Sequence, residues 1–142
     1  MTGKSSPCTE TILIVDDQEG DRRLISITLG DLGYEVIEAK DGSSALEIFK
    51  STPNIDLVLT DILMPGMDGV ELVEQIRKIS PKTSILYISS FPQDYAHKLS
   101  GSEIDVIHKT HDFSHLPEKV REVLENKKHK IKSWVKKLRK KV

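Results

Sequence analysis

The sequence predicts a single α/β domain whose five parallel strands, in the order 2-1-3-4-5, form a doubly wound sheet with helices on both faces. Strand-like and helix-like periods alternate along the chain, which is the pattern of consecutive βα units. Three of the five strand-like runs are almost wholly apolar, as strands buried on both faces of a parallel sheet are. The 142 residues, 37% of them hydrophobic, suffice for one sizeable core and leave no room for a second folded domain.

The first two predicted strands each lead into a helix. Gly33 follows the apolar periodicity of the first helix and can end it, because glycine tolerates the backbone conformation found just past a helix. Asp41 can cap the second helix, which ends before Pro53 because the residue preceding a proline disfavours the helical region. The elements predicted in this half are a strand over Thr11–Val15, a helix over Asp21–Leu32, a strand over Tyr34–Ala39 and a helix from Asp41 to before Pro53.

The second half repeats this alternation with one weak element. The third helix carries an apolar stripe and stops at Ser80-Pro81. Pro92 and Gly101 bracket too few apolar positions for more than a short fourth helix. The elements predicted here are a strand over Ile55–Thr60, a helix over Val70–Ile79, a strand over Ser84–Ser89, the short helix within Phe91–Ser102, a strand over Asp105–His108 and a fifth helix from about His115.

Composition favours a reducing, aqueous compartment. Cys8 is the single cysteine, so no disulfide can form within one chain. Residues 1–10 lack the apolar segment of a secretory signal, and no apolar run approaches the ~18 residues of a membrane span. We therefore expect a soluble, cytoplasmic protein without an integral membrane segment and with a disordered tail over residues 1–10.

Polar side chains stand where four of the predicted strands end. Asp16 and Asp17 follow the first strand, Asp61 the third, Ser89 closes the fourth and Lys109 follows the fifth. The carboxyl ends of parallel strands share the edge at which open α/β sheets place their ligands. Mg²⁺ prefers oxygen ligands, so Asp16, Asp17 and Asp61 predict a magnesium site. Singly, each residue has an ordinary alternative, since Asp can cap a helix, Ser can belong to a turn and Lys can be a solvated charge.

The same edge suits phosphoryl chemistry. Asp61 can act as a nucleophile that forms an acyl phosphate when a metal ion and cationic groups neutralise the oxygens of the transferring group. Lys109 fits the role of a point charge on one phosphate oxygen, and Ser89 that of a hydroxyl donor to another. The joint pattern is far more specific than any one of its members.

Through these residues the chain resembles the receiver domain of two-component response regulators. The motifs that carry the resemblance are Val15-Asp16-Asp17, the segment Asp61-Ile-Leu-Met-Pro-Gly-Met-Asp-Gly69, Ser89 and Lys109, in that order. It covers about Thr11 to Asn126, which sets a receiver domain over residues 11–126 with a flavodoxin-like strand order. It implies a signalling module that is not an enzyme, and the stand-alone, chemotaxis-type receivers are the most similar kind.

The resemblance also assigns roles to the site. It implies that Asp61 accepts a phosphoryl group from a phosphohistidine on a sensor histidine kinase or a phosphotransfer protein. Asp16, Asp17 and Asp61 would bind Mg²⁺, joined by the backbone carbonyl of Leu63. Ser89 and Lys109 would bind the phosphoryl group after transfer and so bias a conformational switch that a downstream protein partner reads. Gly66 and Gly69 would allow the tight turn beside the acceptor.

Two positions depart from the family pattern. Val106 stands where many receivers carry an aromatic residue whose rotamer follows the switch, so Phe91 or Tyr95 would have to replace it, or the backbone would carry the signal. Thr110 stands where a proline in a cis peptide commonly follows the lysine. Because a cis bond costs a non-proline residue ~3 to 4 kcal/mol, we expect a trans Lys109-Thr110 bond.

The C-terminal residues 127–142 form a basic segment with helical periodicity. They contain nine Lys or Arg and no acidic residue, which leaves 12 basic against 22 acidic residues in the rest of the chain. Ile131, Trp134, Val135 and Leu138 recur at helical spacing, which predicts a basic amphipathic extension of the fifth helix. A solvated extension, contact with an anionic membrane surface or nucleic acid, partner binding and self-association remain open, with a monomer or weak dimer expected.

Three other interpretations compete with the receiver. The first is phosphorylation-regulated membrane or nucleic-acid binding through the basic segment. The second is a phosphatase-like enzyme, disfavoured because haloacid dehalogenase-like phosphatases place nucleophile and acid two residues apart, whereas Asp16 and Asp17 are adjacent. The third is a transition-metal cluster of His108, His111 and His115, for which surface histidines are the simpler account.

Overall fold

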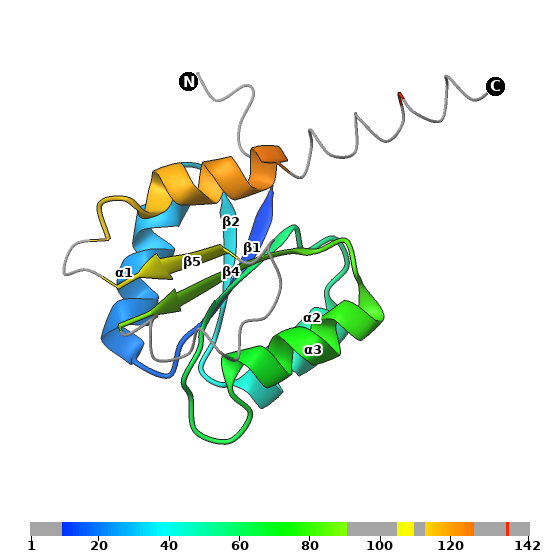
Figure 1. The fold of residues 1–142 in the computed structure, drawn as a ribbon. Helices are drawn as coiled ribbons and strands as arrows, with labels where there is room; N and C mark the ends of the chain where they lie inside the picture. The colour runs from blue at the N-terminus through cyan, green and yellow to red at the C-terminus, as the bar shows by residue number, and fades with distance from the viewer. Residues whose placement is uncertain (1–9, 91–104, 110–112, 127–135, 137–142) are drawn as a thin grey trace.

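The computed structural model describes residues 10–90, 105–109, 113–126 and 136 (Figure 1). They form a five-stranded sheet of order β2-β1-β3-β4-β5, in which every neighbouring pair is parallel. The predicted flavodoxin-like α/β fold and strand order are therefore confirmed. The elements are β1 (Thr11–Val15), α1 (Glu19–Gly30), β2 (Glu35–Ala39), α2 (Gly42–Ser51), β3 (Leu57–Asp61), α3 (Gly69–Ile79), β4 (Ser84–Ser89), β5 (Asp105–His108) and a helix over residues 116–126.

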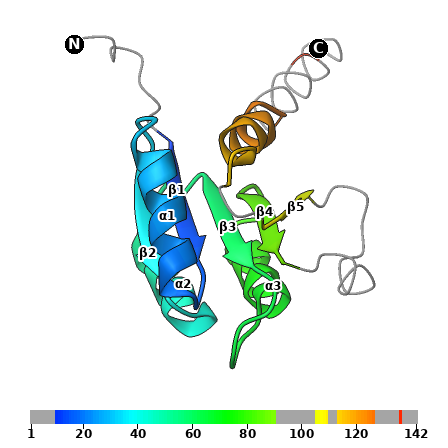
Figure 2. The same cartoon turned by 90° about the vertical axis from the view of Figure 1, so that its left-hand side faces the viewer.

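Helices cover both faces of the sheet, as Figure 2 shows. Helix α1 and the helix over 116–126 pack on one face, whereas α2 and α3 pack on the other. Alternate residues of β1 feed the two cores, because Ile12 and Ile14 face the first and Leu13 and Val15 the second. The apolar runs in the sequence are thus explained by burial on both sides.

Strand register brings the functional edge into line. Val15 pairs with Ala39 on one side and Thr60 on the other, Asp61 pairs with Ile88, and Ser89 pairs with His108. The carboxyl ends of β1, β3, β4 and β5 therefore lie along one edge. All five residues of β3 are buried, so the strand that ends at Asp61 is held at the centre of the molecule.

The element limits agree with the sequence prediction except at a few ends. Helix α1 begins and ends two residues earlier than predicted. The Asp16 carboxylate accepts a hydrogen bond from the backbone N of Gln18, the N-cap residue, which fixes the start of the helix at Glu19. Strand β3 begins two residues later than predicted, because the Asp56 side chain accepts a hydrogen bond from Thr11 N at the start of β1. It also ends one residue later and includes Asp61. Gly33 has the positive φ of 103° expected just beyond a helix.

The predicted cap of α2 is confirmed, because Asp41 Oδ1 accepts a 2.8 Å hydrogen bond from Ser44 N. A second cap was not predicted. Asp68 and Glu71 form a reciprocal capping box at the start of α3, in which each side chain accepts a backbone N–H of the other.

Several predictions fall outside the described residues. These are the tail over residues 1–9, the short helix with Phe91 and Tyr95, the Lys109-Thr110 peptide bond, His111 and nearly all of the basic segment over 127–142. None of the described helices is long and apolar enough to cross a membrane.

Candidate functional site

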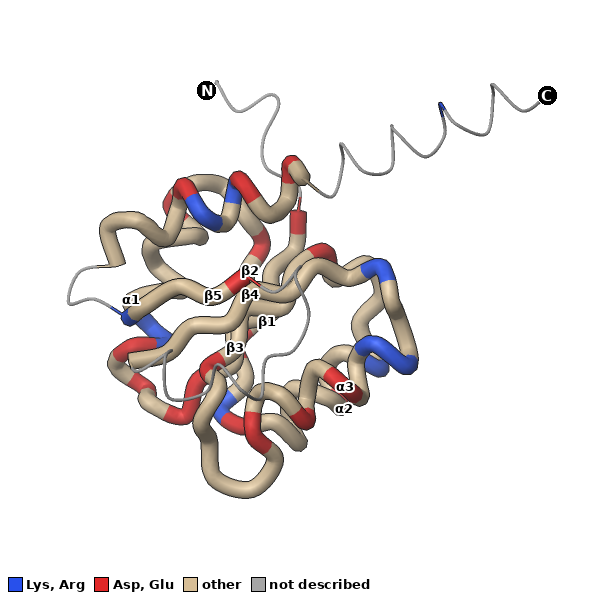
Figure 3. The backbone as a smooth tube through the Cα atoms, in the orientation of Figure 1, with Lys and Arg blue, Asp and Glu red and all other residues tan. Residues whose placement is uncertain are grey.

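Three carboxylates meet where β1 and β3 end. Asp16, Asp17 and Asp61 each offer an oxygen within 4.8 Å of the others. Asp16 is fully buried and Asp61 is 7% exposed, whereas Asp17 is exposed to solvent. Figure 3 shows acidic positions gathered at this edge of the sheet, beside the start of α1. Such a set is stable only with a cation close by, because like charges in a buried site repel.

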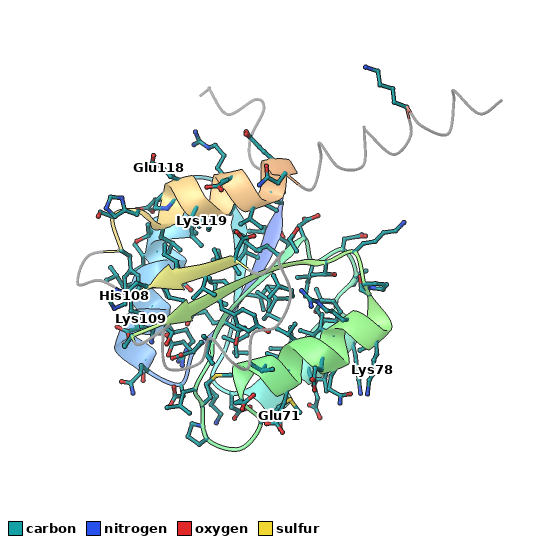
Figure 4. All side chains as sticks on the ribbon, in the orientation of Figure 1. Glu71, Lys78, His108, Lys109, Glu118 and Lys119 are labelled. Carbon is teal, nitrogen blue, oxygen red and sulfur yellow. The ribbon has the colours of Figure 1, made fainter. Side chains whose placement is uncertain are left out.

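Lys109 supplies one cation from the end of β5, where Figure 4 labels it. Its Nζ lies 2.9 Å from Asp16 Oδ2, 3.0 Å from Asp61 Oδ2 and 3.1 Å from Asp21 Oδ2. Its backbone N donates a 2.8 Å hydrogen bond to Ser89 O, which extends the β4–β5 ladder by one residue. The sheet itself therefore aims Lys109 at the carboxylates.

Hydrogen bonds from Arg22 connect the backbone at Asp16 to strand β2. Arg22 Nη1 donates a 2.9 Å hydrogen bond to the Asp16 carbonyl, and Arg22 Nε donates one of 3.0 Å to Glu38 Oε1. Asp16 Oδ1 accepts a 2.9 Å bond from Gln18 N. A planar guanidinium can hold two partners at a fixed mutual angle, so Arg22 ties the β1–α1 turn to β2.

The loop after Asp61 is held tight by two glycines that act in different ways. Gly66 has a positive φ of 77°, as the turn requires. Gly69 instead donates a 2.8 Å hydrogen bond to Ile62 O and lies so close to the Asp61 carbonyl that an added Cβ would collide with it. Only Gly66 therefore supports the predicted conformational role, whereas Gly69 is required by close packing.

Burial and charge pull the site's pKa values in opposite directions. Burial raises the pKa of Asp16 and of Asp61, although the nearby Lys109 ammonium partly offsets this effect. Burial alone would lower the pKa of Lys109, but its close contacts with the Asp16 and Asp61 carboxylates outweigh burial and raise that pKa. We infer that Lys109 stays charged and that burial disfavours the ionised form of the Asp16 and Asp61 carboxyls.

Asp17 and Asp61 open onto a cleft of about 640 Å³, whereas the buried Asp16 does not line it. Its lining residues are Asp17, Gln18, Asp21, Asp61, Leu63, Met64, Pro65, Ser89, Ser90 and Lys109. Leu63 is 60% exposed, and its backbone N donates a 3.3 Å hydrogen bond to Asp61 Oδ1. Ser89 also lines the cleft and is buried, and the neighbouring Ser90 carbonyl lies 2.7 Å from His108 Nε2.

The residues present fit a hard divalent cation. Asp16 Oδ2 is buried and has no hydrogen bond of good geometry among the described residues, even though the Lys109 ammonium is near. That oxygen is held only by its ion pair with Lys109, so it keeps lone pairs with which it could coordinate a metal ion. Within the described part of the chain, the three aspartates are the only His, Cys, Asp or Glu group close enough to share one, so His108 and His115 form no such cluster there.

The structure thus brings together Asp16, Asp17, Asp61, Ser89 and Lys109, with Leu63 on the cleft wall. Val106 is half-buried and packs against the core beneath α2 and α3, away from this cleft. Sequence reasoning missed Asp21 and Arg22. The only signal was their position on the first turn of the helix that follows Asp17, which does not tell which way the side chains reach.

Comparison with known proteins gives consistent matches. A family profile described as "Response regulator receiver domain" matches residues 12–121. The response regulator TrrA of Thermotoga maritima, solved with Mg(2+)-BeF, is 35% identical with a TM-score of 0.73, over 81% of this chain and 99% of that one. The chemotaxis protein CheY4 of Vibrio cholerae is 28% identical with a TM-score of 0.71, over 82% of this chain and 99% of that one.

Longer curated proteins also contain a similar segment. The autoinducer 1 sensor kinase/phosphatase LuxN of Vibrio harveyi is 36% identical over 102 residues, which are 72% of this chain and 11% of LuxN. The probable transcriptional regulator ycf27 of Porphyridium aerugineum is 36% identical over 119 residues, 81% of this chain and 48% of that protein. The chain therefore spans about a tenth of LuxN and about half of ycf27.

Proposed function

The chain belongs to the response regulator receiver family, and on that premise we propose that Asp61 accepts a phosphoryl group from a phosphohistidine on a histidine kinase or phosphotransfer protein. Receivers are phosphoacceptor signalling modules, so the family match decides against the phosphatase-like enzyme. The observation that carries the proposal is the setting of Asp61. Its carboxylate lies at the end of the central strand, between Lys109 and Leu63 N, and opens on the cleft.

The proposed transfer makes one bond and breaks one. An Asp61 carboxylate oxygen bonds to phosphorus as the phosphorus–nitrogen bond of the phosphohistidine breaks, and the departing imidazole nitrogen takes a proton from solvent. Lys109 is placed to neutralise charge on the transferred oxygens, while Leu63 N orients the acceptor. Bound Mg²⁺ would supply further charge neutralisation. Asp16, Asp17, Asp61 and the Leu63 carbonyl are the groups that we propose hold it.

We propose that Ser89 and Lys109 then bind the phosphoryl group and transmit its presence. Ser89 lines the cleft from the end of β4, and Lys109 follows the end of β5. New charge-assisted hydrogen bonds at these two strand ends would draw the β4 loop and β5 toward Asp61. Because Val106 lies under α2 and α3, the change would reach a downstream protein through backbone and loop movement rather than through an aromatic side chain at that position.

The proposal is tested by phosphate uptake from phosphoramidate in the presence of Mg²⁺. Wild type should gain the mass of one phosphoryl group by intact mass spectrometry, and Asp61→Asn should gain none, because an amide cannot form the acyl phosphate. Asp31→Asn removes an exposed aspartate at the end of α1 and serves as the matched control. Uptake by Asp61→Asn equal to that of wild type would remove Asp61 as the acceptor.

A further inference from the structure

Asp21 is an unexpected member of the cleft. It lies in the first turn of α1, and its Oδ2 accepts a 3.1 Å hydrogen bond from Lys109 Nζ. Its side chain is 40% exposed, whereas those of Asp16 and Asp61 are almost enclosed. Asp21 also lines the cleft onto which Asp61 opens. It is therefore both a partner of the proposed phosphate-binding lysine and a charge facing the space where a phosphoryl group would sit.

We propose that Asp21 is a positioning residue that holds the Lys109 ammonium in the unphosphorylated protein and competes for it with the incoming phosphoryl group. The inference rests on the proposed function, because it assumes that Asp61 is the acceptor. Asp21 touches no reacting atom and acts only through Lys109. It would thereby lower the level of phosphorylation that the receiver reaches with a given donor.

The N–H donors of the Lys109 ammonium are limited in number and already engaged. Lys109 has three N–H groups, and two of them make hydrogen bonds of good geometry, to Asp61 and to Asp21. A phosphoryl group on Asp61 needs such donors for its own oxygens. Release from Asp21 costs the least, because water can replace the ammonium at an exposed carboxylate, whereas the buried Asp16 has no such replacement.

The charge around the cleft also favours this competition. The Lys109 ammonium contacts Asp16, Asp21 and Asp61, and Asp17 lines the same cleft. Among the described residues that line the cleft, Lys109 is the only Lys or Arg, and the nearby Arg22 guanidinium is bonded to Glu38 and a backbone carbonyl. A phosphoryl group adds further negative charge to the same space. After transfer, Asp21 would lose its partner and face an anion of like sign. Its carboxylate therefore stabilises the unphosphorylated form relative to the phosphorylated one.

Glu19 offers a matched control within the same helical turn. It carries the same charge as Asp21, is exposed, and makes no ion pair with Lys109 among the described residues. Glu19→Gln thus changes the general field at the cleft, and Asp21→Asn removes the contact as well. A partly exposed ion pair is worth ~1 kcal/mol or less, so we expect Asp21→Asn to act by about two- to fivefold.

The test is the affinity of the Mg²⁺-loaded protein for beryllofluoride, measured by calorimetry, with the rate of phosphate uptake from phosphoramidate as a second readout. Asp21→Asn should bind beryllofluoride more tightly and take up phosphate faster than wild type by the stated factor, with Glu19→Gln close to wild type. Structural damage would weaken binding instead. The inference would be overturned if the two variants shifted equally in affinity, or if Asp21→Asn bound beryllofluoride no more tightly than wild type. Phosphate uptake by wild type would leave the proposed function standing in each of these cases. Failure of wild type to bind or react would overturn both.

Discussion

At the scale of single residues, the site depends on side chains that never enter the proposed chemistry. Arg22 is the clearest example, because it joins the Asp16 carbonyl to Glu38 on the neighbouring strand. Partners behind a metal ligand hold that ligand in its binding orientation. The carboxylates of Asp16 and Asp17 extend from the turn that Arg22 holds, so their spacing depends on this contact.

We predict that Arg22→Lys weakens Mg²⁺ binding by about tenfold, the lower end of what removal of such a supporting contact costs. Lysine retains the charge but cannot bond both partners in the fixed geometry of a guanidinium. Isothermal titration with MgCl₂ measures the effect, and Arg23→Lys on the exposed side of the same turn is the control. Unchanged affinity in Arg22→Lys would show that Asp16 needs no such support.

The convergence of Asp16, Asp17, Asp61, Ser89 and Lys109 could be predicted from the sequence, because all of them stand at or just beyond strand ends and parallel strands end together. The participation of Asp21 and Arg22 could not. Both lie on a helix, where the direction in which a long or charged side chain reaches depends on the packing angle of that helix against the sheet. Sequence periodicity shows which face of a helix packs on the sheet, but not the tilt of the helix relative to the sheet or its distance from it.

At the scale of elements, caps decide where the helices begin. The N-cap of α2 was predictable because Asp41 precedes a helical apolar pattern, whereas the start of α1 was not, since its N-cap Gln18 makes no side-chain cap. The backbone N–H of Ser44 and its hydroxyl both bond Asp41 and lower the pKa of its carboxyl. A carboxyl with a lowered folded-state pKa stabilises the fold only while it is ionised.

We predict that Asp41→Ala lowers the free energy of unfolding by about 1 kcal/mol at pH 7. Because the folded-state pKa is below the ordinary value of 3.8, the charge-dependent part of this stabilisation is fully present above that pH and is lost as the pH falls through the lowered pKa. Urea unfolding at several pH values measures both parts. Asp41→Asn, which can still cap but cannot titrate, should lie between wild type and Asp41→Ala at pH 7 and should show no loss of capping as the pH falls. A loss at pH 7 as large as that of Asp41→Ala would assign the effect to charge alone.

At the scale of the whole molecule, the buried carboxylates of the site lower the stability of the fold. Folding buries Asp16 and Asp61 and raises the pKa of each, so these two carboxylates bind protons more readily in the folded protein than in the unfolded chain. The cost of these ionised carboxylates is therefore present above their raised pKa values and is relieved as the pH falls toward 3.8. A bound divalent cation would relieve the same cost at neutral pH.

We predict that Mg²⁺ stabilises the domain by about 1.4 kcal/mol at a concentration tenfold above its Kd, at pH 7. The increment should shrink as the pH falls through the raised pKa values of Asp16 and Asp61, because protons then compete for the same oxygens. Thermal unfolding with MgCl₂, against NaCl at equal ionic strength, measures it. An increment that stays constant or grows on acidification would place the ion elsewhere.

The sheet also distributes mechanical constraint unevenly around Asp61. Strand β3 is flanked by β1 and β4 and buried along its whole length, whereas β5 is one of the two edge strands, pairs only with β4 and has no fully buried residue. If Asp61 and Lys109 are drawn together, β3 therefore resists movement more than β5 does. We expect a phosphoryl group on Asp61 to move β5 more than β3, which would place the change of shape on the β5 side of the molecule, at the opposite edge of the sheet from β2.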